Sequence, residues 1–83
     1  MRAGAALMNA HFAVRLRGSL GLTRRQWRML RRLARGEHVR RRQRRRLAAK
    51  GYWTGDPRTV NREAIFTVVP RELHGALERA LRP

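Results

Sequence analysis

The segment from Leu22 to Gly36, LTRRQWRMLRRLARG, decides the fold that we expect for this chain of 83 residues. Thr23 has the position of a helix N-cap, Gln26 follows at the spacing of a capping box, and Leu22 can pack on Trp27 as a hydrophobic staple. Gly36 suits the left-handed position that ends many helices. The segment predicts a helix whose apolar face, at helical spacing, comprises Trp27, Leu30, Leu33 and Ala34.

A second helix is expected directly after it. Glu37 and His38 form a two-residue hinge, followed by VRRRQRRRLAAKG, which Gly51 ends. A narrow inward stripe lies at i, i+4 and i+8, at Val39, Gln43 and Leu47. So many like charges at i, i+3 and i, i+4 would destabilise an isolated helix. This helix should therefore depend on its neighbour or on a bound anion.

The following residues favour a β-hairpin with a long tip. Tyr52-Trp53-Thr54 has strand composition, residues 55–58 read as a turn, and Ile65–Val69 is a run rich in β-branched residues. Because side chains alternate across a strand, we expect one of Tyr52 and Trp53 to be buried and the other exposed.

A C-terminal helix of about 12 residues should begin at Pro70. Glu78, four residues before Arg82, should support it through an ion pair. Its apolar face comprises Leu73, Ala76, Leu77, Ala80 and Leu81.

Residues 1–21 form a basic N-terminal segment, which we expect to be either helical or flexible. Leu7, His11 and Val14 fit one face of a helix, whereas Phe12, Val14 and Leu16 alternate as in a strand. The alanine-rich part favours a helix. An N-terminus that carries arginine and no acid is also compatible with an organellar presequence.

Charge indicates the class of partner. The chain has 21 Lys and Arg against 5 Asp and Glu, a formal charge of +16. Residues 1–36 carry nine arginines and no acid, and residues 37–50 carry seven basic residues against Glu37. Since a polyanion relieves such self-repulsion and releases counter-ions, nucleic acid is the expected partner and the first fifty residues the expected binding surface.

Residue types with other chemistry are scarce. The chain has no cysteine, and its three histidines lie in separate segments, so we expect no metal site and no cofactor. No Ser-His-Asp or paired-carboxylate arrangement is visible, and we expect no catalytic site and no enzyme. The Gly18–Gly21 G-x-x-G is more consistent with a linker than with a KH-type loop.

The order of these elements resembles a winged helix-turn-helix domain. LTRRQWRMLRRLARG is similar to the opening of MarR-type regulators, RRRLAAKGYW to their recognition-helix exit, and FTVVPRELHGAL to their wing exit. The resemblance implies a mainly α domain over residues 22–83, with three to four helices and a small β-hairpin wing. This chain lacks the further short helix that MarR-type regulators normally have between the counterparts of Gly36 and Val39. Either residues 3–16 supply the first of three helices, or the domain is shortened.

By the same resemblance, the arginine-rich helix enters the major groove of duplex DNA and the hairpin tip contacts the backbone. Most of its arginines should contact phosphates, since six cannot all read bases. The residues expected to bind nucleic acid are Arg40, Arg41, Arg42, Arg44, Arg45, Arg46 and Lys50, with Arg58 and Arg62 at the wing tip. Further phosphate contacts are expected from Arg24, Arg25, Arg28, Arg31 and Arg32.

We therefore expect a small DNA-binding transcriptional regulator, of the kind that phages and mobile elements carry, in the cytoplasm of a cell or host. The alternatives are an RNA-binding ribosomal or organellar protein, and a phage factor whose basic face binds and inhibits an acidic host protein. A homodimer through the N-terminal segment or the C-terminal helix fits the first reading. The longest uncharged run, residues 3–14, is too short and polar to span a membrane.

Overall fold

The computed structural model describes the backbone of residues 2–55 and 60–82, and side chains from residue 11 onward. This part of the chain is mainly helical, as predicted, and its β-structure is one antiparallel bridge between Trp53 and Val60. The elements are α1 (Arg2–Ser19), α2 (Arg24–Ala34), α3 (Arg41–Ala49), α4 (Arg62–Val68), the 3-10 helix η1 (Arg71–Leu73) and α5 (His74–Ala80).

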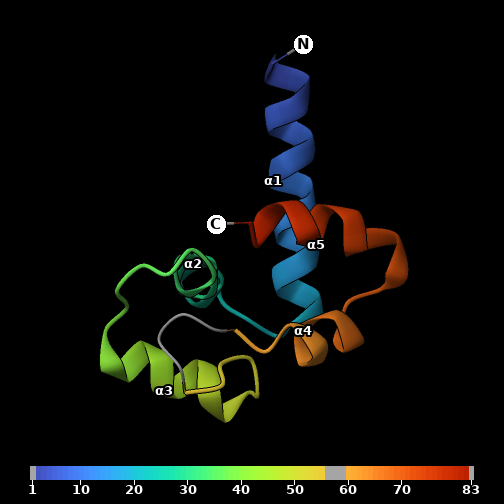
Figure 1. Ribbon diagram of the computed structural model, residues 1–83. Coiled ribbons are helices and arrows are strands. Elements are labelled where there is room, and N and C mark those ends of the chain that lie inside the picture. Colours follow the sequence, from blue (N-terminus) through green and yellow to red (C-terminus); the bar gives the residue numbers. More distant parts are fainter. Residues whose placement is uncertain (1, 56–59, 83) are drawn as a thin grey trace.

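The helices cross one another at steep angles. In Figure 1, α5 passes across the middle of α1, and the first turns of α1 extend beyond the rest of the protein. The same view shows α2 nearly end-on and α3 lengthwise beneath it, so their axes cross steeply. All five α-helices or their flanking turns contribute to one core of buried apolar side chains, which includes Leu16, Leu20, Leu30, Leu47, Ile65 and Leu77.

The signals that predicted α2 are confirmed. The Thr23 Oγ1 atom accepts a hydrogen bond from the Gln26 N–H at 3.1 Å, and the Thr23 N–H donates to Gln26 Oε1 at 3.0 Å, which completes the capping box. Trp27, Leu30 and Leu33 are buried. The helix thus has both its own cap and a continuous apolar face.

The turn from α2 to α3 is longer than the predicted two-residue hinge. Gly36 adopts a φ of 77°, as expected, and its N–H donates to the Leu33 carbonyl at 2.9 Å. The Glu37 N–H donates to the Arg32 carbonyl at 2.9 Å, completing a Schellman motif. Helical structure resumes only at Arg41, because the chain stays extended through the capping position before it, so the connection comprises residues 35–40.

The predicted stripe of Val39, Gln43 and Leu47 is buried, at 2%, 7% and 1% exposed, but Val39 lies in the connection and only Gln43 and Leu47 belong to α3. Gly51 ends it with a φ of 85°, and the Tyr52 N–H donates to the Leu47 carbonyl at 3.0 Å. No side chain caps the N-terminus of α3.

The predicted strand Ile65–Val69 is wrong, because residues 62–68 form α4. The Asn61 side chain accepts a hydrogen bond from the Ala64 N–H at 3.2 Å and caps this helix. Ile65 and Val69, four residues apart, are 0% and 3% exposed, so a helical turn buries both. Capping and burial override the β-propensity of the run.

The C-terminal segment has the predicted apolar face but begins with a 3-10 turn. Leu73, Leu77 and Leu81 are buried, while Ala76 and Ala80 pack against them. The expected pair of Glu78 with Arg82 does not form, since α5 ends at Ala80; Glu78 binds Arg62 at the start of α4 instead.

The N-terminal segment, predicted to be either helical or flexible, is a helix in the structure. The side chains of Leu16 and Leu20, each 2% exposed, bind α1 and its following turn to the core. The Gly18–Gly21 motif forms the end of α1 and its turn, where the Ser19 hydroxyl donates to the Arg15 carbonyl at 2.9 Å. None of the described helices is long and apolar enough to cross a bilayer.

Candidate nucleic-acid interface

The outward face of α3 carries a dense group of guanidinium groups. Residues 41 and 45, and residues 42 and 46, are spaced by four, so each pair stands on one side of the helix. All four arginines are exposed, as are the residues that flank the helix at either end, Arg40 and Lys50. We call the surface formed by Arg40, Arg41, Arg42, Arg45 and Arg46 the α3 face.

Contacts with the end of α1 hold α3 in place behind this face. The Tyr52 hydroxyl donates to the Leu20 carbonyl at 2.8 Å, and burial raises the pKa of this phenol. The Lys50 ammonium donates to the Gly21 carbonyl at 3.1 Å. Lys50, predicted only as a nucleic-acid contact, thus also joins the end of α3 to the turn after α1.

Arg44 differs from its neighbours on α3. It is half-buried, and its guanidinium carbon lies 5.5 Å from the centre of the Trp53 ring, a cation–π distance. Trp53 is half-buried and Tyr52 buried, which confirms the expected burial of one of the two; the other is covered only in part. Arg44 therefore supports the turn after α3 from the edge of the α3 face.

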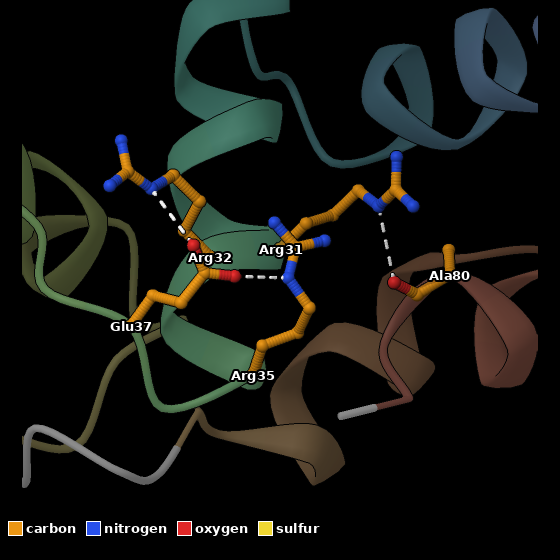
Figure 2. Close-up of polar contacts among 5 residues, drawn as sticks. All are labelled: Arg31, Arg32, Arg35, Glu37 and Ala80. Atoms are coloured by element: carbon orange, nitrogen blue, oxygen red, sulfur yellow. Dashed lines mark hydrogen bonds and ion pairs between the residues drawn. The ribbon is translucent and has the colours of Figure 1, made fainter.

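Three of the four acidic residues in the described part of the chain pair with arginines outside the α3 face. Glu72 lies 3.8 Å from Arg15, and Glu78 binds Arg62. Figure 2 shows the carboxylate of Glu37 against the ends of Arg32 and Arg35. Among residues 11–55 and 60–82, no ion pair involves an arginine of α3.

Glu37 is the only acid in the first fifty residues. The hydrogen bond from Arg35 lowers the pKa of its carboxyl, and the charges of Arg35 and Arg32 act in the same direction. Its negative charge therefore lies at the C-terminal end of α2, in the connection to α3. Two arginines, Arg32 of α2 and Arg35 at its cap, thus share one negative charge, whereas the arginines of α3 pair with no described acid.

The remaining predicted site residues that the structure describes lie on elements other than α3. Arg24 and Arg28 line a hollow against α1, and Arg31 donates from Nε to the Ala80 carbonyl at 3.2 Å (Figure 2). Arg25 is exposed. Arg62 is the first residue of α4 and lies over the Phe66 ring at 5.2 Å, and Arg58 lies outside the described residues.

Sequence reasoning missed Arg17, which lines the same hollow as Arg24 and Arg28. It also missed the contacts of Lys50 with Gly21 and of Arg31 with Ala80. No local pattern indicates such contacts between distant positions. No family model, curated protein or solved structure matches this chain.

Proposed function

We propose that this protein binds duplex DNA by placing α3 in the major groove. The observation that carries the proposal is the α3 face itself, where exposed arginines stand four apart and pair with no described acid. A cationic surface that pairs with none of the described carboxylates is available to an external anion. Guanidinium groups bind phosphate bidentately, and a nucleic acid presents phosphates in a dense row.

The geometry of a helix favours duplex DNA over RNA. The major groove of B-DNA admits an α-helix, whereas that of A-form RNA is deep and narrow. Arginines at the centre of the α3 face would reach guanine edges, and those at its margins would bind phosphates. Arg25, exposed on α2, supplies one more phosphate contact.

The proposal retains the helix-turn-helix arrangement from the winged-helix resemblance. Helix α2 supports α3 from behind, and α3 is the recognition helix. In this proposal, the antiparallel bridge between Trp53 and Val60 would form the base of a wing, in place of the predicted hairpin between residues 52–54 and 65–69. An exposed basic helix supported by a second helix suits a transcriptional regulator of the kind that phages and mobile elements carry.

An electrophoretic shift assay tests the proposal. Random duplex DNA, single-stranded DNA and structured RNA are compared at two salt concentrations. We expect duplex DNA to bind most tightly, with an affinity that falls with a log–log slope of about 0.9 per phosphate neutralised. A complex insensitive to salt, or a preference for structured RNA, would overturn it.

A further inference from the structure

Two hollows run side by side along α1, away from α3. One, of about 390 Å³, lies among α1, α2 and α5, and the other, of about 300 Å³, lies between α1 and α2. Both are lined by Ala13, Trp27 and Arg31, so they form one elongated depression, which we call the α1 groove. No residue of α3 lines either hollow.

Apolar side chains from two helices line part of the α1 groove. Phe12 and Leu16 come from α1, and Ala76 and Ala80 from α5. Val14 lines the second hollow and is 54% exposed, the more exposed of the two large apolar side chains that face solvent in the described part of the chain. Contact of this surface with water is unfavourable, so a partner that covers it gains free energy.

The rim of the α1 groove is cationic. Arg17, Arg24 and Arg28 line the α1–α2 hollow, and Arg79 lines the hollow toward α5. Arg31 stands where the two hollows meet, and its Nε bond to the Ala80 carbonyl fixes its side chain between α2 and α5 (Figure 2). None of the acidic residues that the structure describes lines either hollow.

We propose that the α1 groove binds an acidic, amphipathic peptide segment of a partner protein. Apolar side chains of the segment cover Phe12 and Val14, and its carboxylates meet the guanidinium groups of the rim. An apolar centre inside a charged rim is the ordinary anatomy of a protein interface. Charge complementarity steers the partner to the groove.

Other occupants match the groove less well. A DNA backbone satisfies the arginines of the rim but leaves Val14 and Phe12 without an apolar partner. A second copy of this chain brings a further charge of +16, which opposes association. Only a segment that is both acidic and apolar complements floor and rim together.

The inference goes beyond DNA binding and stands independently of it. Because the groove and the α3 face share no residue, the chain can hold DNA and a partner segment at once. It would then act as an adaptor that brings an acidic protein to DNA.

The test measures fluorescence anisotropy of a labelled peptide of about 16 residues, long enough to form a helix. Leucines occupy one face and glutamates the others, and a polyglutamate of equal length is the control. With the full chain we expect the amphipathic peptide to stay bound when salt rises above about 0.15 M, whereas polyglutamate dissociates.

Two exposed valines provide a matched pair of variants. Val14→Glu places in the groove a carboxylate that repels the glutamates of the peptide, and it should weaken peptide binding roughly tenfold or more. Val68→Glu, at a valine of α4 that is 47% exposed, makes the same change outside the groove and should leave binding unchanged. Thermal melts confirm that both variants fold, and Arg28→Ala against Arg45→Ala repeats the comparison with cations.

Three results would overturn the inference. The first is an equal response to Val14→Glu and Val68→Glu. The second is displacement of the peptide by duplex DNA together with weakening by Arg45→Ala, which would place the peptide on the α3 face. The third is a single-stranded oligonucleotide that binds in a Val14-dependent way when the peptide does not. A failure of DNA binding alone leaves the peptide result intact, so the two proposals fail separately.

Discussion

Helices α2 and α3 each contain five arginines, but they use them differently. In α2, Arg31 binds the Ala80 carbonyl and Arg32 lies 3.6 Å from Glu37. Among the described contacts of the α3 arginines, the one with another side chain is the cation–π contact of Arg44 with the Trp53 ring. The count of arginines is therefore the same in the two helices, while the number left for an external partner is not.

The two helices also differ in what makes them helical. Helix α2 has a complete capping box and three buried side chains, whereas α3 has no side-chain cap and two buried side chains. The first is stabilised by its own sequence and the second by its neighbours. This contrast fits the proposal that α2 is the scaffold and that α3 is the element that binds DNA.

The largest expected effect is the loss of folding on replacing Leu30 of α2, which is 0% exposed. A buried Leu→Ala change costs about 2–5 kcal/mol. A chain of this size has roughly 4–12 kcal/mol of total stability. We expect Leu30→Ala to lower Tm by at least about 10 °C in a thermal melt followed by circular dichroism.

Arg25→Ala, an exposed change on the same helix, is the control and should shift stability by less than about 0.5 kcal/mol. A Tm for Leu30→Ala equal to that of the control would show that α2 is not the scaffold.

The next effect concerns binding and tests the α3 side of the comparison. Arg41→Ala with Arg45→Ala removes two exposed guanidinium groups from the α3 face. If each contacts one phosphate, the salt slope falls by about 1.8, and counter-ion release alone then costs about 30-fold in affinity at 0.15 M salt. Measuring the Kd for duplex DNA at several salt concentrations gives both quantities.

The matched variant is Arg32→Ala with Arg35→Ala, which removes the same charge from the arginines that surround Glu37. Since those groups already have a partner, we expect a smaller loss of affinity. Equal losses for the two double variants would mean that only net charge matters, and the recognition role of α3 would be abandoned.

A smaller effect tests the cap that distinguishes α2. Replacing an N-cap threonine by alanine costs about 1 kcal/mol. Thr23→Ala should therefore lower Tm by roughly 4–8 °C. Thr67→Ala, an exposed threonine inside α4 whose hydroxyl bonds the Glu63 carbonyl, is the control, and its stability should change by less than about 0.5 kcal/mol. An equal Tm for Thr23→Ala and Thr67→Ala would mean that the capping box adds no measurable stability to α2.

Much of this contrast was predictable because it is local in sequence. The capping box of Thr23 and Gln26, and the positive φ of Gly36 and Gly51, involve neighbours within a few residues. The apolar periods of α2, α3 and α5 were also read correctly. The run Ile65–Val69 was not, since its β-branched composition was given more weight than the equally local cap at Asn61, and the core buries both Ile65 and Val69.

The candidate interface was predictable in part for the same reason. A run of arginines on one helix shows in the sequence. The sequence does not show which basic side chains bind other parts of the chain. Lys50 binds a carbonyl 29 residues away, and Arg31 binds one 49 residues away. Likewise, the α1 groove needs three helices to come together, and no single segment predicts it.

The smallest expected effect comes from Glu37, which ties the end of α2 to the connection with α3. Its pKa is lowered in the folded state from the ordinary 4.5, so the folded state binds fewer protons than the unfolded chain. Its contribution to stability is therefore present above pH 4.5 and disappears as pH falls through the lowered value. Glu37→Gln should melt slightly below the native protein near neutral pH, and the gap should close in acid.

Salt provides the second control for Glu37. The carboxylate is exposed, so about 1 M salt should screen its attraction to Arg32 and Arg35 and remove the difference in Tm at neutral pH. A difference that persists at high salt or in acid would mean that the side chain acts through packing. If Glu37→Gln also raises affinity for duplex DNA, the two released guanidinium groups have joined the binding surface. The contrast between α2 and α3 then rests on this one carboxylate.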